Sequence, residues 1–125
     1  EPGVTVTAFD IPHGLGPDFC LHLMSVVSPV SEDLAVVYEP LAPVRLLREL
    51  HTRGVEVLPL PEEDNLTLGC NVLAIRPGVA VIASGNDATV ALLRDHGVEV
   101  HVYEASEISK GEGGPTCLTR PLLRG

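Results

Sequence analysis

The chain has few aromatic and few basic side chains. It contains no Trp, two Tyr and two Phe, so any domain core must be built from aliphatic residues, which its hydrophobic content of 45% supplies. Its 8 Lys and Arg stand against 17 Asp and Glu, which gives a formal net charge of −9. Binding to a nucleic-acid backbone needs basic side chains that displace counterions, so this balance argues against nucleic acid as a partner.

Cysteine patterns typical of metal sites and disulfide frameworks are also absent. Cys20, Cys70 and Cys117 form no CxxC pair, and their spacing suits no zinc site. Free thiols favour a reducing compartment. The sequence has neither an apolar run of about 18 residues nor a signal-peptide pattern. We therefore expect a cytoplasmic protein without metal, cofactor or membrane partner.

A repeated motif organises the chain. Gly-Val-x-Val occurs at Gly3-Val4-Thr5-Val6, Gly54-Val55-Glu56-Val57 and Gly97-Val98-Glu99-Val100, and each copy opens a run that favours a strand. Helical patterns precede the second and third copies, and the glycine directly after each helix is a typical left-handed stop. These helices are expected over residues 43–53 and 86–96, the second with Asn86 as its N-cap.

Two strand-like runs come before each predicted helix. They cover residues 21–28 and 34–39 before the first helix, and residues 71–75 and 79–84 before the second. The resulting ββαβ unit recurs with a period of about 45 residues, which indicates a modular architecture. The sequence therefore predicts an α/β fold of repeated ββαβ units.

The phase of the repeats divides the chain. We expect residues 1–12 to be the last strand of a preceding unit, 13–64 and 65–110 to be two units, and 111–125 to be a cysteine loop with a closing strand. The chain is then the C-terminal portion of a single domain, with the N-terminal portion as a companion segment or chain. Open strand edges would also allow a homo-oligomer.

Three motifs carry a resemblance to a known superfamily. They are Leu21-His22-Leu23, Gly69-Cys70-Asn71-Val72-Leu73-Ala74-Ile75 and Gly113-Gly114-Pro115-Thr116-Cys117-Leu118-Thr119. In this order, with this module phase, the chain resembles the guanidine-modifying enzymes: arginine deiminases, dimethylarginine hydrolases and amidinotransferases. The resemblance covers residues 3–122 and implies that the chain is part of a five-bladed α/β propeller (pentein) with an active site in its central channel.

The resemblance implies a chemistry for two residues. Cys117 would attack the guanidinium carbon and form a covalent thiouronium intermediate, while His22 acts as general acid and base. Resonance makes that carbon a poor electrophile, so a thiolate is a suitable nucleophile, and an imidazole exchanges protons near neutral pH. Gly111, Gly113 and Gly114 lie just before the cysteine, where they permit positive φ and a close approach of the backbone to a ligand.

Substrate-binding candidates are Gly114, Asn71 and Glu112. Glu112 stands five residues before Cys117, where arginine deiminases carry an arginine for the substrate carboxylate. Met24 replaces the Asp of their His-x-Asp motif. Dimethylarginine hydrolases lack that Asp too, so Met24 makes the chain resemble them more closely. An anion facing a substrate carboxylate is unfavourable, so either Glu112 points to solvent or the substrate is cationic or neutral at that end, which argues against free arginine. The superfamily's guanidinium-binding carboxylates fall mainly in its N-terminal half, and the acids of this chain's loops, Asp64 among them, are expected to be solvated.

The predicted function is hydrolysis of a guanidino C–N bond, with a guanidino small molecule as substrate. Two alternatives remain open. The protein could be an amidinotransferase that passes the amidino group to an amine, or a non-catalytic propeller that only binds a ligand.

Overall fold

Two ββαβ units make up the body of the molecule, which is seen here as a computed structural model that describes residues 3–11, 16, 22–111 and 113–122. The first unit consists of β1 (Val27–Pro29), β2 (Leu34–Val37), α1 (Val44–Thr52) and β3 (Glu56–Pro59). The second consists of β4 (Leu73–Arg76), β5 (Val79–Ala83), α2 (Asp87–Asp95) and β6 (Glu99–Tyr103). All of them overlap the ranges predicted from the sequence.

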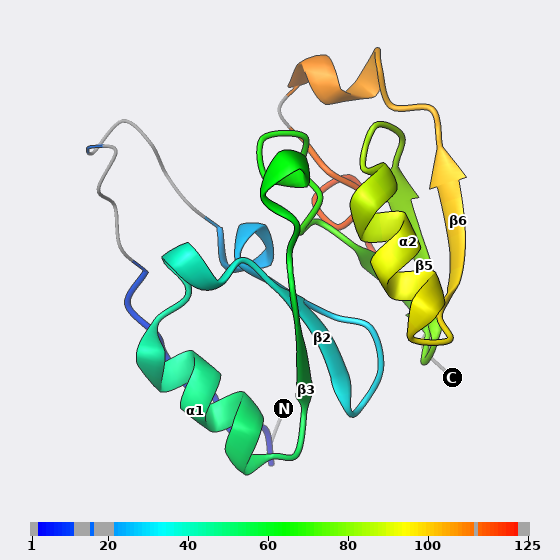
Figure 1. Cartoon of the computed structure of the whole chain (residues 1–125). Helices are drawn as coiled ribbons and strands as arrows, with labels where there is room; N and C mark the ends of the chain where they lie inside the picture. Colours follow the sequence, from blue (N-terminus) through cyan, green and yellow to red (C-terminus); the bar gives the residue numbers. More distant parts are fainter. Residues whose placement is uncertain (1–2, 12–15, 17–21, 112, 123–125) are drawn as a thin grey trace.

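Each unit forms its own three-stranded sheet (Figure 1). The orders are β1-β2-β3 and β4-β5-β6, and the middle strand pairs antiparallel with the first strand and parallel with the last. A parallel pair needs a crossover connection, which α1 and α2 provide. Ala35 and Ala80 occupy equivalent places in the two middle strands, and both are completely buried. The repeat seen in the sequence is therefore a repeat of structure.

Glycine ends both helices as predicted. Gly54 and Gly97 have φ values of +72° and +78°, in the left-handed region that glycine adopts at low cost. The backbone turns there into β3 and β6. A residue with a Cβ would be strained at either position.

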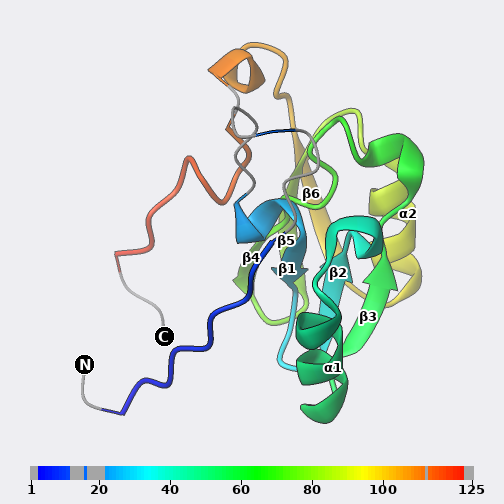
Figure 2. The same ribbon diagram turned by 90° about the vertical axis from the view of Figure 1, so that its left-hand side faces the viewer.

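One hydrophobic cluster joins the units. It contains Val36 and Leu58 from the first sheet, Ile82 and Val100 from the second, and Leu93 from α2. Figure 2 shows α2 on one side of the strands and the C-terminal segment (red) on the other side. The C-terminal segment therefore lies away from α2.

The two outer strand predictions were wrong. Residues 4–11 form no strand, and Phe9 instead packs against the smaller cluster under α1, with the Arg45 guanidinium 5.9 Å from its ring centroid. Residues 118–122 form no closing strand either. A strand needs a hydrogen-bonded neighbour, and no described segment pairs with these two.

Short 3₁₀ helices connect the main elements: η1 (Leu23–Ser25), η2 (Glu39–Leu41), η3 (Glu62–Asp64) and η4 (Ile108–Gly111). The first of them lies within the strand predicted over residues 21–28, and of that range only Val27 and Ser28 are in β1. None of the helices in the described ranges is long and apolar enough to cross a membrane.

Candidate cysteine site

Cys117 is an exposed, free thiol on a tight turn. Leu118 N donates to Gly114 O at 3.1 Å, and the Thr119 hydroxyl donates to Pro115 O at 2.7 Å. Gly114 and Pro115 are buried, whereas Cys117 faces outward. The turn is therefore anchored by its first half and presents the sulfur on its second half.

Asn71 is the side chain that anchors this turn. Its Oδ1 accepts hydrogen bonds from Thr116 N at 3.0 Å and from the Thr116 hydroxyl at 2.7 Å. A backbone N–H can only donate, so the amide oxygen must face Thr116 and the amide NH₂ must face the other way. That NH₂ lies 3.6 Å from Cys117 Sγ. The amide therefore directs a donor at the sulfur, from a side chain that is 3% exposed.

Gly114 makes this contact possible. A Cβ at Gly114 would lie 2.3 Å from Asn71 Cγ, far inside van der Waals contact. The close approach expected of the glycines is therefore made to the Asn71 side chain. The expected positive φ is not found at Gly111, Gly113 or Gly114.

The other predicted site residues, His22 and Glu112, have no described contact with Cys117. His22 is exposed and precedes η1 with extended backbone angles (φ −93°, ψ 149°), which corrects its predicted place within a strand. Among the described residues, no hydrogen bond links its ring to Cys117. Glu112 lies outside the described residues. The structure thus brings Asn71, Gly114 and Cys117 together and adds Thr116, which the sequence did not single out.

A family model for arginine deiminase matches residues 38–124. The chain belongs to the arginine deiminase family. The match contains Asn71, Gly114 and Cys117, whereas His22 precedes it.

Curated arginine deiminases are similar to part of the chain. The enzyme from Bacillus cytotoxicus is 50% identical over 56 residues, which are 45% of this chain and 14% of that protein. The enzyme from Limosilactobacillus fermentum is 46% identical over 86 residues, covering 63% of this chain and 21% of that protein. The chain thus spans about a fifth or less of the length of these relatives.

Solved structures of the guanidine-modifying superfamily share the fold. SxtG, an amidinotransferase from Microseira wollei, superposes with a TM-score of 0.67 at 16% identity, over 85% of this chain and 34% of that one. ArgZ, an arginine dihydrolase from cyanobacteria, gives 0.66 at 20% identity, over 82% and 17%. The paired ββαβ units are therefore a fold that this chain shares with those two proteins.

A buried polar network lies beside the site of this arginine deiminase family member. Asp64 Oδ2 accepts from Thr89 N at 2.6 Å and from the Thr89 hydroxyl at 2.7 Å. Asp64 is 4% exposed and Thr89 is fully buried. The expectation that Asp64 would be solvated was therefore wrong, because this loop acid folds back onto the N-terminus of α2.

Asn86 occupies the N-cap position of α2 as predicted, but its side chain does not cap the helix. Its Nδ2 donates to Thr67 O and Ala83 O, each at 3.0 Å, and its Oδ1 accepts from the Thr67 hydroxyl at 2.7 Å. The capping role passes to Asp64. The side-chain acceptor that a helix N-terminus needs is thus supplied to α2 by a residue distant in the sequence.

Cys70 differs from Cys117 although it adjoins Asn71. It is 3% exposed, and burial raises the pKa of its thiol to about 12. Ser28, from β1, donates to Cys70 O and accepts from Val72 N at 3.2 Å, which ties this segment to the first unit. Cys70 is a structural thiol, and Cys117 is the accessible one.

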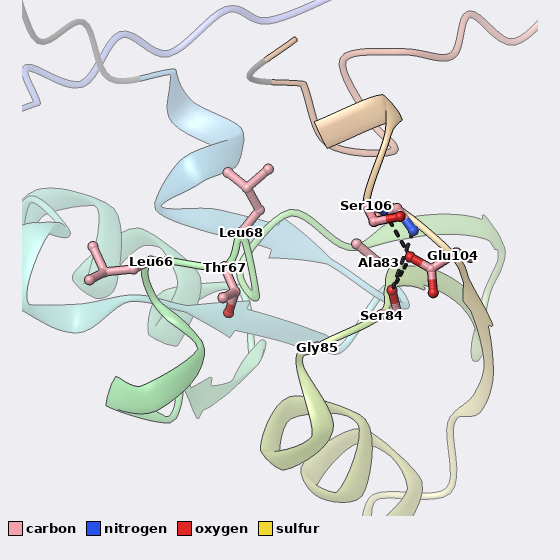
Figure 3. A pocket seen from close by; sticks show the side chains of 9 residues that line it. Leu66, Thr67, Leu68, Ala83, Ser84, Gly85, Glu104 and Ser106 are labelled. Atoms are coloured by element: carbon pink, nitrogen blue, oxygen red, sulfur yellow. Dashed lines mark hydrogen bonds between the residues drawn. The ribbon is translucent and has the colours of Figure 1, made fainter. Parts of the chain in front are cut away.

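A cavity of about 510 Å³ opens next to the network (Figure 3). Leu66 and Leu68 line one side, while Ser84 and Glu104 line the other, where Glu104 Oε1 accepts from Ser106 N at 2.9 Å. That hydrogen bond is the largest cause of the lowered pKa of Glu104. Neither Cys117 nor Asn71 lines the cavity. In the described ranges, no cluster of His, Cys, Asp and Glu could hold a metal ion.

Proposed function

We propose that the protein containing this chain is a hydrolase that cleaves a C–N bond of a guanidino compound, with Cys117 as its nucleophile. The observation that carries the proposal is the Asn71 donor beside the exposed sulfur of a cysteine in the arginine deiminase family. A donor at 3.6 Å from the sulfur stabilises negative charge there. Thiolate is the form that attacks carbon.

The proposed reaction has two steps. In the first, Cys117 Sγ bonds to the guanidinium carbon, and an amine leaves with a proton from His22. In the second, His22 takes a proton from water, the hydroxide attacks the thiouronium carbon, and the C–S bond breaks to restore the thiolate. Arginine would give citrulline and ammonia. His22 has a suitable chemistry for both transfers, and its exposed ring is free to meet a substrate.

L-Arginine is the first substrate to test, because the matching curated relatives are arginine deiminases. Met24, in place of the Asp of the His-x-Asp motif, keeps N-methylated arginines in the set, as the resemblance to dimethylarginine hydrolases predicts. Asn71 and Gly114 would then shape the site by fixing the Cys117 turn. Glu112, which lies outside the described residues, stays a predicted substrate contact.

We further propose that the chain completes a five-bladed propeller with an N-terminal companion segment. β4 is an edge strand of its sheet, and Ile75 on it is 61% exposed. A cavity of about 740 Å³ lies between β4 and the segment around Arg120. An apolar edge of this kind favours cover by further protein. The free thiols keep the cytoplasm as the expected compartment.

The direct test is turnover by the full-length protein. L-Arginine and dimethylarginine are supplied separately, and citrulline is measured for wild type, Cys117→Ala and Cys70→Ala. We expect citrulline from at least one substrate, no turnover by Cys117→Ala, and retained turnover by folded Cys70→Ala. Full activity of Cys117→Ala, or no turnover of any guanidino compound by wild type, would overturn the proposal.

The same assay separates transfer from hydrolysis. Adding an amine acceptor such as glycine would give an amidino-transfer product only if the alkyl amine of the substrate, ornithine in the case of arginine, leaves in the first step and the acceptor amine then displaces Cys117 from the remaining amidino group. Hydrolysis predicts citrulline at the same rate with and without the amine. A binding propeller predicts no product but saturable binding of the guanidino compound.

A further inference from the structure

We propose that Asp64 and Thr89 are positioning residues that set the reactivity of Cys117 through the turn at Leu68–Asn71, an inference that rests on the proposed function. Neither side chain contacts Cys117 in the structure. They act on it through Gly69 and Asn71. We call the set Asp64, Gly69, Asn86 and Thr89 the clamp.

The first step is the choice of cap for α2. A helix of nine residues could be capped by its own Asn86, which stands at the N-cap position. The cap instead comes from Asp64, 25 residues before Thr89. A buried carboxylate costs free energy unless it is well hydrogen-bonded, and a helix N-terminus is a favourable environment for it. The arrangement therefore fastens the loop to the helix as well as capping the helix.

The second step is the contact between Asp64 and Gly69. Gly69 N donates to Asp64 O at 2.8 Å. A Cβ at Gly69 would lie 2.7 Å from both Asp64 Cβ and Asp64 O, and 3.0 Å from Asn86 Oδ1. The backbone of Gly69 is thus held against Asp64 and Asn86, with no room for adjustment toward them.

The third step is strain in the turn. Leu68 has φ +65°, the only positive φ of a residue other than glycine among those described. The left-handed conformation costs such a residue on the order of 1–2 kcal/mol, so the surrounding contacts must hold it. Asn71 N donates to Leu68 O at 2.9 Å and closes the turn. The clamp and this hydrogen bond together hold Leu68 in its left-handed conformation.

The last step leads to the sulfur. The backbone of Asn71 is fixed by the turn, and its amide holds Thr116 and faces Cys117 Sγ. A shift of the turn would move the Asn71 NH₂ away from the sulfur, because Gly114 already lies against the same amide. Since Cys117 is already exposed, loosening the clamp gains little access for a reagent and loses the donor. Asp64 and Thr89 therefore affect the reactivity of the Cys117 thiol through the turn at Leu68–Asn71.

The experiment uses the full-length protein with Cys20→Ser in every variant, and peptide mass spectrometry separates alkylation at Cys117 from alkylation at Cys70 and at any other cysteine. The variants are Asp64→Asn and Thr89→Ala. Thr89→Ser keeps the hydroxyl that Asp64 accepts from, and Asp87→Asn changes an exposed acid in the first turn of the same helix. The rate of iodoacetamide alkylation at Cys117 is measured by mass spectrometry, and kcat and KM are measured with the active guanidino substrate. Urea unfolding confirms that each variant is folded under assay conditions.

We expect Asp64→Asn and Thr89→Ala to lower the Cys117 alkylation rate and kcat by about threefold to tenfold, the effect of weakening one hydrogen bond to a charged group. KM should change by less than about twofold, because the clamp does not touch the substrate. Thr89→Ser and Asp87→Asn should match wild type. If Asp64→Asn fails to fold, Thr89→Ala against Thr89→Ser carries the test.

The inference is overturned if folded Thr89→Ala alkylates and turns over like wild type, which would make Asp64 a helix cap and no more. A rise in KM at unchanged kcat would also overturn it. Failure of the proposed function has a different signature: no turnover by wild type, with alkylation at Cys117 still sensitive to Thr89→Ala.

Discussion

The two ββαβ units share strand order and helix length but differ in how their helices are held. In α1 the N-cap position is Pro43, which offers no side-chain cap, and only Leu46 is buried. In α2 the Asp64 carboxylate caps Thr89, and Thr89, Val90 and Leu93 are all buried. The unit with the better-anchored helix is the one whose Asn71 holds the cysteine turn. The repeated ββαβ unit provides the fold, and the tighter anchoring of α2 in the second unit fixes the position of the cysteine turn.

The largest effect expected is at the contact between the turn and the second unit. Gly114→Ala would place a Cβ 2.3 Å from Asn71 Cγ, and the displaced turn should lower kcat by about 100-fold, as small misplacements of reacting groups do. Gly111→Ala is the matched control, since a Cβ there meets nothing within 4 Å and its φ is not positive. Steady-state kinetics on both variants checks this. Equal activity of the two variants would contradict the claim that the contact between Gly114 and Asn71 positions the cysteine turn.

The next prediction concerns the helices themselves. Leu93→Ala in α2 removes a side chain that is 0% exposed, and should lower the free energy of unfolding by about 3 kcal/mol. Val44→Ala in α1 removes one that is 62% exposed and should change it by less than about 0.5 kcal/mol. Urea denaturation of the full-length protein measures both. A similar loss in the two variants would deny that α2 is the better-packed helix.

Cys70 provides a pH test of the second unit. Its thiol pKa is raised by burial from 9.0 to about 12, so the folded state binds the proton more tightly than the unfolded state. The stability that this proton contributes is complete below pH 9.0 and is lost as the pH rises toward about 12. One unit above the unfolded value the loss is about 1.4 kcal/mol. Unfolding free energies should therefore fall more steeply between pH 8 and about 10 in wild type than in Cys70→Ala. Parallel curves would show that Cys70 is not buried in solution.

The smallest effect belongs to the surface of α1. Arg53 Nη2 lies 2.6 Å from Glu49 Oε1, but both side chains are well exposed, at 63% and 39%. Arg53→Ala should cost less than about 0.5 kcal/mol and should lose most of that effect in high salt. Thermal unfolding at low and high salt measures it. A larger loss of stability from Arg53→Ala than from Leu93→Ala would contradict the conclusion that α2 is the better-anchored helix.

Local patterns predicted the elements of the fold. The strand-like runs before each helix, the stops at Gly54 and Gly97 and the Gly-Val-x-Val copies at these two glycines placed both helices and six strands, because these signals depend on neighbouring residues. Whether an outer segment forms a strand depends on a pairing partner elsewhere in the structure, which local patterns do not reveal. Residues 4–11 were therefore wrongly predicted as a strand. At His22 the strand pattern gave way to η1, which no nearby turn signal indicated.

The site was only partly visible in the sequence. The glycines before Cys117 indicated a close approach, but not that Asn71 would be its partner, since the two residues are 46 apart. The burial of Asp64 follows from its contact with Thr89, across β4 and β5, and no local pattern encodes it. Gly69 was the one available signal, because a glycine before a strand suggests a close backbone approach.

The central claim is that Cys117 bonds to a guanidino carbon. Acid quenching of the full-length protein during turnover, followed by mass spectrometry of its peptides, tests it most directly. The account predicts an adduct of the substrate minus its leaving amine on the peptide that contains Cys117, and none on the peptide with Cys70. Turnover with no adduct at Cys117, and undiminished turnover after Cys117 has been alkylated, would contradict it.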